Sequence, residues 1–323
     1  MFKKIICVAL SLALCAGFMG GCGKTSENSG KDSGKLSIVC TIFPEYDWVK
    51  NIVGEADCDI TMLLDNGTDL HNYQPTTADM VKVSECDMFI YVGGESDKWV
   101  DDVLKTAKNK DMQVINLMDV MGNSAKEEEV KEGMQAEEES EEEEIEYDEH
   151  VWLSLKNAEN FCNTISESLI EIDKDNADLY KTNCDSYVKQ LVSLDVEFAD
   201  AVKNAKQNIL VFGDRFPFRY FVDDYKLDYF AAFVGCSAET EASFETIVFL
   251  AGKVDELGVP AIMTIENSNE KIAKSILDNT KDKSAKILTL NSMQSVTSEN
   301  VSEGETYLKI MSDNLAVLKE ALG

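Results

Sequence analysis

The sequence contains few histidines and few basic residues, and each shortage excludes a class of function. Its 30 basic residues stand against 60 acidic ones. That balance excludes a nucleic-acid-binding protein, because phosphate backbones require a basic surface. No HExxH or comparable compact metal-and-base motif is present. This absence argues against a metallohydrolase, which needs an open metal position and a general base.

Cysteine is present without the spacing that would give it a structural role. The chain has nine cysteines but no CxxC pair, so neither a zinc ribbon nor a disulfide framework is indicated. Several of the six that follow Cys22 adjoin apolar runs, and we expect such cysteines to be small buried core residues. These six are Cys40, Cys58, Cys86, Cys162, Cys184 and Cys236.

The first 21 residues have the order of regions found in a secretory signal. A basic start leads to an apolar run at residues 5–18 and then to small residues before Cys22. The apolar run is shorter than the ~20 residues that span a bilayer. We expect residues 1–21 to be a signal peptide, Cys22 to be lipidated as in a bacterial lipobox, and residues 22–35 to be a flexible tether. The alternative is an ordinary signal peptide with an incidental cysteine. No later apolar run is long enough for a transmembrane helix, so attachment would be by lipid alone, on the extracytoplasmic face of the membrane.

An N-terminal α/β lobe is predicted for residues 36–156. Apolar runs alternate with helical stretches, so the strand candidates are residues 36–42, 59–64, 87–92 and 113–117, and the helix candidates are residues 46–53, 77–84 and 98–107. This alternation predicts a parallel sheet with helical crossovers. His71 follows the second strand, and ligand sites in such sheets lie beyond the carboxyl ends of strands.

An acidic segment at residues 122–149 interrupts this lobe. Fourteen of its residues are Asp or Glu and two are Lys. Like charges at this density repel one another, so the segment predicts a solvated, disordered loop. Weak collection of cations would be an added role.

The rest of the chain predicts a helical spine and a second α/β lobe. Residues 157–206 have apolar positions at helical intervals, with a break expected at residues 173–176. Residues 207–323 repeat the α/β alternation, with strand candidates at residues 208–212, 227–233, 261–266 and 286–290, and helix candidates at residues 244–257, 270–279 and 303–322. The predicted fold class is therefore α/β, with two lobes of mainly parallel sheet flanked by helices and joined by a long, rigid spine.

The two histidines, His71 and His150, are the candidate ligands. They lie in Thr68-Asp-Leu-His71-Asn-Tyr-Gln-Pro and Tyr147-Asp-Glu-His150-Val-Trp-Leu, 79 residues apart, so only folding can bring them together. Neutral imidazole is the commonest metal ligand. The alternative is that both are surface or capping residues without a ligand.

Several segments, taken in order, resemble the metal-binding lipoproteins of zinc and manganese ABC importers. They are Ile42-Phe-Pro44, Gly67-Thr-Asp-Leu-His71-Asn-Tyr-Gln-Pro-Thr76, Gly93-Gly-Glu95 with Trp99, and Asp148-Glu-His150-Val-Trp-Leu with Lys156-Asn-Ala158. The match covers essentially the whole chain after the signal. In many zinc-type members the loop before the second histidine is histidine-rich, whereas here it is acidic.

The resemblance implies one divalent ion held between two lobes by four ligands. Two of them correspond to His71 and His150, and the fourth, an acidic residue closing a strand, corresponds to Glu266. The third is a His or Glu in the family, but the corresponding segment, Val211-Phe-Gly213-Asp214-Arg215-Phe216-Pro217-Phe218-Arg219, has neither. Asp214 is its nearest carboxylate, and Asp214 is alternatively a helix cap or an ion-pair partner of Arg215 or Arg219. Competing third ligands are Cys236, Glu239 and Glu241.

These inferences point to a monomeric solute-binding lipoprotein that delivers zinc to an ABC permease and is not an enzyme. Two imidazoles with one or two carboxylates suit tetrahedral Zn²⁺ at ~2.0–2.2 Å. More carboxylate oxygen and a higher coordination number would favour Mn²⁺, so a manganese receptor is the alternative. An adhesion lipoprotein, in which the histidines are incidental, explains the ordered two-lobe pattern less well.

Overall fold

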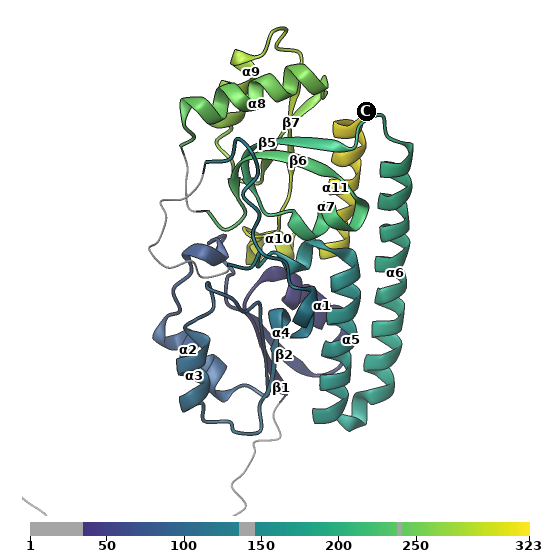
Figure 1. The fold of residues 1–323 in the computed structure, drawn as a ribbon. Helices are drawn as coiled ribbons and strands as arrows, with labels where there is room; N and C mark the ends of the chain where they lie inside the picture. The colour runs from purple at the N-terminus through teal and green to yellow at the C-terminus, as the bar shows by residue number, and fades with distance from the viewer. Residues whose placement is uncertain (1–34, 136–145, 238–240) are drawn as a thin grey trace, which may run out of the picture. The chain divides into compact units, whose positions relative to one another are not determined.

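The computed structural model describes residues 35–135, 146–237 and 241–323 (Figure 1). Within it, Lys35–Gly323 forms one compact unit. The predicted signal peptide, the lipidation candidate Cys22, nearly all of the predicted tether and the ligand candidate Glu239 lie outside the described residues.

The first lobe is a four-stranded parallel sheet with the strand order β2-β1-β3-β4. Its strands are β1 (Leu36–Cys40), β2 (Cys58–Met62), β3 (Met88–Tyr91) and β4 (Gln113–Asn116). The intervening helices are α1 (Phe43–Val53), α2 (Thr77–Glu85), α3 (Val100–Thr106) and α4 (Leu117–Met121). All four residues of β3 are buried, as expected for a central strand covered on both faces. The predicted parallel α/β lobe is confirmed.

The second lobe repeats this arrangement, with the strand order β6-β5-β7-β8. Its strands are β5 (Ile209–Phe216), β6 (Asp228–Val234), β7 (Ala261–Ile265) and β8 (Lys286–Leu290). Its helices are α7 (Arg219–Tyr225), α8 (Phe244–Leu257), α9 (Lys271–Asn279), α10 (Ser298–Ser302) and α11 (Tyr307–Leu322). The strand pattern predicted both sheets, but it did not predict the short helices α4, α7 and α10.

One strand differs from its prediction in a way that affects the site. The apolar run ends at Phe212, but β5 continues to Phe216 because its register with β6 shifts between Phe212 and Arg215. Such a β-bulge lets pairing resume after an irregular residue. The strand predicted for residues 208–212 would leave Asp214 just past its end, but Asp214 lies within β5 at the bulge, so that expectation is wrong.

Two helices, α5 (Leu155–Ile172) and α6 (Ala177–Asn204), form the spine and lie side by side (Figure 1). The predicted break is present, because a turn of 3₁₀ helix at Lys174–Asn176 separates them. The 28 residues of α6 extend over about 42 Å at 1.5 Å per residue. Helix α6 contacts α1 of the first lobe and α11 of the second, so a single helix supports both lobes.

Asp47 joins three of these helices. Its Oδ2 accepts hydrogen bonds from the Tyr187 hydroxyl at 3.1 Å and the Tyr307 N–H at 3.2 Å. Asp47 belongs to α1, Tyr187 to α6 and Tyr307 to α11. Burial raises the pKa of Asp47 to about 6, against the lowering effect of the two hydrogen bonds.

The acidic segment is ordered in its described parts, residues 122–135 and 146–149, so the prediction of a disordered loop is wrong there. Glu127 and Tyr147 form an antiparallel bridge, and the Lys126 Nζ lies 2.7 Å from Asp223 of the second lobe. The Gln135 N–H donates to the Ala232 carbonyl at 3.0 Å. These parts are ordered because their charged side chains and backbone bind the rest of the protein. Their lysines pair with acidic residues, their glutamates bind Arg219 and a backbone N–H group, and their backbone hydrogen-bonds to β6. The glutamate run, seven glutamates between residues 137 and 144, lies outside the described residues.

The six described cysteines are all free, and four of them are buried. Among the described residues, no helix has both the length and the apolar character needed to cross a membrane.

Candidate metal centre

His71 lies in the loop after β2, in a short 3₁₀ turn (Leu70–Asn72) that Asp69 caps. The Asp69 Oδ1 accepts the His71 N–H at 3.0 Å. The His71 ring has its Nδ1 2.9 Å from the Ser96 Oγ and its Nε2 3.1 Å from the Nε2 of His150. Folding thus brings the two predicted histidine ligands together from positions 79 residues apart.

His150 is fully buried and its orientation is fixed by Asp148. The Asp148 Oδ1 lies 2.8 Å from the His150 backbone nitrogen and 3.0 Å from its Nδ1. An ionised carboxylate only accepts hydrogen bonds, so Nδ1 carries the proton and Nε2 presents its lone pair. That Nε2 faces His71 and is 2.9 Å from the amide nitrogen of Gln294.

A third donor, Cys236, joins the two rings. Among the described residues, the donor atoms of His71, His150 and Cys236 form a group in which all lie within 4.8 Å of one another. Cys236 follows β6, and its backbone N–H donates to the Glu128 Oε1 at 3.0 Å. Burial raises the pKa of the Cys236 thiol, and the charges of Asp148 and Glu128 raise it further.

The separation of the two imidazole nitrogens suits a single tetrahedral ion. Zn–N bonds of about 2.0–2.1 Å at a tetrahedral angle place two nitrogens about 3.3 Å apart, and the observed separation is 3.1 Å. Burial, together with the neighbouring His150, lowers the pKa of His71 to about 3. The His71 ring is therefore neutral near pH 7 and its lone pair is available to a metal.

Glu149 provides a carboxylate beside the other nitrogen of His71. Its Oε1 accepts the Ser96 N–H at 3.1 Å, and its Oε2 lies 3.7 Å from the His71 Nδ1. Burial raises the pKa of Glu149. The chain at Gly94 (φ +77°) runs so close that a Cβ there would lie 2.3 Å from the Glu149 Oε1. A glycine at residue 94 therefore leaves room for this carboxylate.

A cavity of about 260 Å³ opens onto two of the three donors, His71 and Cys236. Besides His71 and Cys236 it is lined by Glu95, Ser96, Glu128, Glu146, Tyr147 and Glu149. Part of the acidic segment therefore forms the entrance, which gives a cation an acidic approach to the rings.

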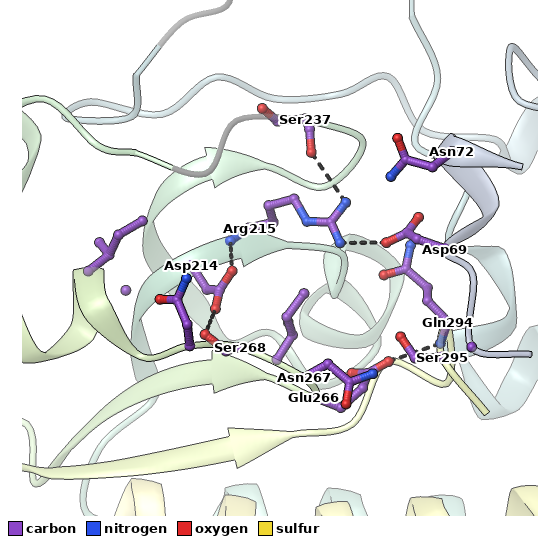
Figure 2. Close-up of a pocket in the computed structure, with 15 residues that line it drawn as sticks. Asp69, Asn72, Asp214, Arg215, Ser237, Glu266, Asn267, Ser268, Gln294 and Ser295 are labelled. Carbon is purple, nitrogen blue, oxygen red and sulfur yellow. Dashed lines mark hydrogen bonds and ion pairs between the residues drawn. The ribbon is translucent and has the colours of Figure 1, made fainter. Parts of the chain in front are cut away.

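Asp214 lies apart from this group, and each of its carboxylate oxygens accepts a hydrogen bond from another residue. Its Oδ2 accepts the Ser268 hydroxyl at 2.5 Å and its Oδ1 accepts the Arg215 N–H at 2.9 Å. It lines a neighbouring cavity of about 320 Å³, together with Asp69 and Glu266 (Figure 2). The two arginines that the sequence offered as ion-pair partners of Asp214 have other partners, because Arg215 pairs with Asp69 and Arg219 pairs with Glu129.

Glu266 directly follows β7, as predicted. A single residue, Gln294, stands between its carboxylate and the His150 ring. Its carboxylate accepts the Ser292 N–H at 2.6 Å, the Ser292 hydroxyl at 2.8 Å and the Gln294 N–H at 3.0 Å. Because the Gln294 side chain contacts His150, Glu266 reaches the histidines through this residue. Burial raises its pKa. The competing candidate Glu241 is exposed and is not part of the three-donor group.

Arg215 is a residue that the sequence reasoning did not place in the site. Its Nη2 lies 2.5 Å from the Asp69 Oδ2, and its Nη1 donates to the Ser237 carbonyl at 3.2 Å (Figure 2). Asp69 stands two residues before His71, and Ser237 stands one residue after Cys236. One guanidinium therefore ties the loop of His71 to the loop of Cys236. The signal in the sequence that could have pointed to Arg215 is its position in the segment where the family carries its third metal ligand.

Comparisons with known proteins agree with this architecture. The zinc-binding lipoprotein AdcA of Streptococcus pneumoniae (strain R6) is 30% identical over 319 residues, covering 98% of this chain and 61% of that protein. The high-affinity zinc uptake system protein ZnuA of Bacillus subtilis (strain 168) is 27% identical over 327 residues, covering 100% of this chain and 99% of that protein. The chain spans only 56–61% of the length of the streptococcal relatives.

A solved structure shows the same fold. The Zn(II)-bound ZnuA-like domain of AdcA from Streptococcus pneumoniae superimposes with a TM-score of 0.70 at 28% identity, covering 90% of this chain and 99% of that one. The family model described as zinc-uptake complex component A, periplasmic (ZnuA), matches residues 38–321. The proteins of that family are transport components and not enzymes. The chain therefore belongs to the ZnuA family of zinc-uptake binding components.

Proposed function

We propose that this protein captures a Zn²⁺ ion outside the cytoplasm and delivers it to an ABC permease. The ion is cargo and undergoes no covalent or redox change. The observation that carries the proposal is the pair of imidazole nitrogens 3.1 Å apart, each on a ring whose other nitrogen faces a protein oxygen. Zinc-binding names among the relatives support this cargo.

His71 and His150 are the proposed imidazole ligands. Asp214 and Glu266 stay predictions from the family pattern, and both would have to leave their present hydrogen bonds to reach an ion. Ser268 binds the first carboxylate, and Ser292 with Gln294 binds the second. Asp214→Asn and Glu266→Gln test them separately, because each keeps the side-chain shape and removes the charge.

Attachment to the membrane through a lipidated Cys22 is part of the proposal. It is supported by the order of regions in residues 1–22 and by the lipoprotein name of a streptococcal relative. The protein would act as a monomer. Metabolic labelling with a fatty-acid analogue tests this part, since Cys22→Ser should abolish incorporation while leaving the chain exported.

The binding proposal is tested by competitive calorimetric titration of the metal-free protein with Zn²⁺ and with Mn²⁺. We expect one tight Zn²⁺ site in the parent protein and a loss of affinity of at least about 100-fold in His71→Ala and in His150→Ala. His71→Ala is the more informative variant, because the buried His150 also contributes to packing. Circular dichroism of each metal-free variant checks that the fold is retained.

Two results would contradict the proposal. Unchanged Zn²⁺ affinity in His71→Ala would reject the site. A site tight for Mn²⁺ and weak for Zn²⁺ would move the protein to the manganese branch that the sequence leaves open.

A further inference from the structure

We propose that the Cys236 thiolate is the third metal ligand and that it makes the site select Zn²⁺ over Mn²⁺. This inference rests on the proposed function, because it completes the same site. The Cys236 donor atom lies within 4.8 Å of the donor atoms of both His71 and His150. A Zn–S bond of about 2.3 Å and Zn–N bonds of about 2.0–2.1 Å fit a group of this size.

The topology places Cys236 as the counterpart of His71. Both lobes follow the same element order, and both sheets have the same relative strand order. His71 lies in the connection between β2 and α2, and Cys236 lies in the corresponding connection between β6 and α8. Each lobe therefore presents a donor from the same place, beyond the carboxyl end of its second strand.

The Cys236 loop is held against the rings by several independent contacts. Glu128 accepts the Cys236 N–H at 3.0 Å, and Arg215 binds the carbonyl of the next residue, Ser237, at 3.2 Å. The preceding residue, Gly235, approaches His150 so closely that a Cβ there would lie 3.0 Å from its Cε1. A side chain at residue 235 would separate the loop from the ring.

Each carboxylate around the rings accepts a hydrogen bond from the protein. The Glu149 Oε2 has no hydrogen-bond partner of its own, but it lies 3.7 Å from the His71 Nδ1, the ring nitrogen that does not face His150. Asp148 accepts from His150, Glu149 accepts from Ser96, and Asp214 accepts from Ser268. Glu128 is bound to the backbone of Cys236 itself. In the cysteine's case, metal binding replaces the S–H bond with an S–Zn bond, and the proton passes to solvent.

A thiolate ligand changes which ions the site prefers. Soft thiolate sulfur favours Zn²⁺, whereas Mn²⁺ prefers carboxylate, carbonyl and water oxygen. Loss of the thiolate should therefore weaken Zn²⁺ binding much more than Mn²⁺ binding. The expected change in Cys236→Ser is a fall of at least about tenfold in the ratio of the Zn²⁺ to the Mn²⁺ association constant.

The test uses Co²⁺ as a spectroscopic probe. A thiolate bound to Co²⁺ gives a charge-transfer band in the near ultraviolet, which imidazole and carboxylate ligands do not give. We expect this band in the parent protein and in the control Cys58→Ser, and its loss in Cys236→Ser. Cys58 is the matched control, since it is the other partly exposed cysteine of the described residues. All variants carry Cys22→Ser, so that the N-terminal thiol contributes nothing.

A second variant keeps the test decisive if Cys236→Ser perturbs the loop. Cys236→His supplies a donor without sulfur, so it should bind Zn²⁺ and give no charge-transfer band. A band that persists in Cys236→Ser or Cys236→His, or a parent protein that binds Co²⁺ without the band, would overturn the assignment of Cys236. Neither result would touch the histidine site, which fails only if His71→Ala retains tight Zn²⁺ binding.

Discussion

Arg215 and Asp69 form an ion pair that joins the two lobes beside the candidate metal centre. The two atoms, Nη2 and Oδ2, are 2.5 Å apart, and the side chains are only 16% and 15% exposed. Burial opposes ionisation of Asp69, but the charge and hydrogen bond of Arg215 hold the pKa of this carboxyl below its usual range. A pair shielded to this degree is screened less by salt than a surface pair. The two loops that carry His71 and Cys236 are therefore held by the same guanidinium.

Arg215→Ala should speed the dissociation of Zn²⁺. The variant frees both loops while leaving every donor atom in place, so we expect a loss of affinity of about 10–100-fold, mostly in the dissociation rate. Arg215→Lys should recover little, because a lysine lacks the planar fork that reaches two partners. Stopped-flow release into a chelator measures the rate. Arg219→Ala, which removes a more exposed pair with Glu129, is the control, and equal release rates in both alanine variants would contradict this role.

Gly235→Ala should weaken metal binding without unfolding the protein. The added Cβ would lie 2.9 Å from the Phe216 carbonyl and 3.0 Å from the His150 Cε1, so the loop must move away from the ring. Gly252→Ala is the matched control, since nothing lies within 4 Å of its Cβ. Gly252 is in α8, where alanine should add up to about 1 kcal/mol of stability. Titration and thermal unfolding of both variants check the pair, and normal Zn²⁺ affinity in Gly235→Ala would show that the loop tolerates displacement.

Asp47→Asn should change how stability depends on pH. Because burial raises the pKa of Asp47 to about 6 in the folded state, the folded protein holds its proton more tightly than the unfolded chain does. The resulting stabilisation is fully present below pH ~4 and is lost as the pH rises through about 6, with a size on the order of 3 kcal/mol. The asparagine does not titrate, so the parent protein should lose stability relative to the variant between pH 4 and pH 7. Urea unfolding at several pH values measures this. A difference between the parent protein and Asp47→Asn that stays constant with pH would contradict a raised pKa of Asp47. Asp200→Asn, at an exposed position of α6, controls for the substitution itself.

Neutralising the glutamate run should slow the capture of metal without removing the site. Seven glutamates lie between residues 137 and 144, and replacing them by glutamine removes negative charge that attracts cations over a distance. We expect one Zn²⁺ site of affinity unchanged within about twofold, and a lower association rate at low ionic strength that approaches the parent's at high salt. Stopped-flow mixing at two salt concentrations measures the effect. Loss of the tight site would show instead that this run supplies a ligand.

The sequence predicted those features of the fold and site that depend on local residue patterns and on the order of the strands and helices. Alternating apolar and helical stretches located both sheets, and His71 was expected beyond a strand end. The positions of Asp214 and Arg215 were less predictable, because the bulge in β5 interrupts the regular alternation of side chains between the two faces of the sheet. Cys236 could only be named as a competitor, since its approach to His150 depends on Gly235 and on pairing with Glu128, more than one hundred residues away in the chain. The acidic segment was mispredicted because charge density was averaged over a stretch whose ends have their own partners.

The tryptophan that follows His150 gives the protein a built-in optical signal. The Trp152 ring is fully buried with its centroid 5.2 Å from that of His150, and its indole N–H donates to the Ser292 carbonyl at 2.9 Å. Indole emission responds to nearby charge, so an ion arriving at His150 should alter the fluorescence of Trp152. Trp48 and Trp99 complete the chain's three tryptophans. Trp152→Phe should abolish the metal-dependent change while those two continue to emit. In the parent protein, the emission of Trp152 would then report the occupancy of the site in real time without an attached dye.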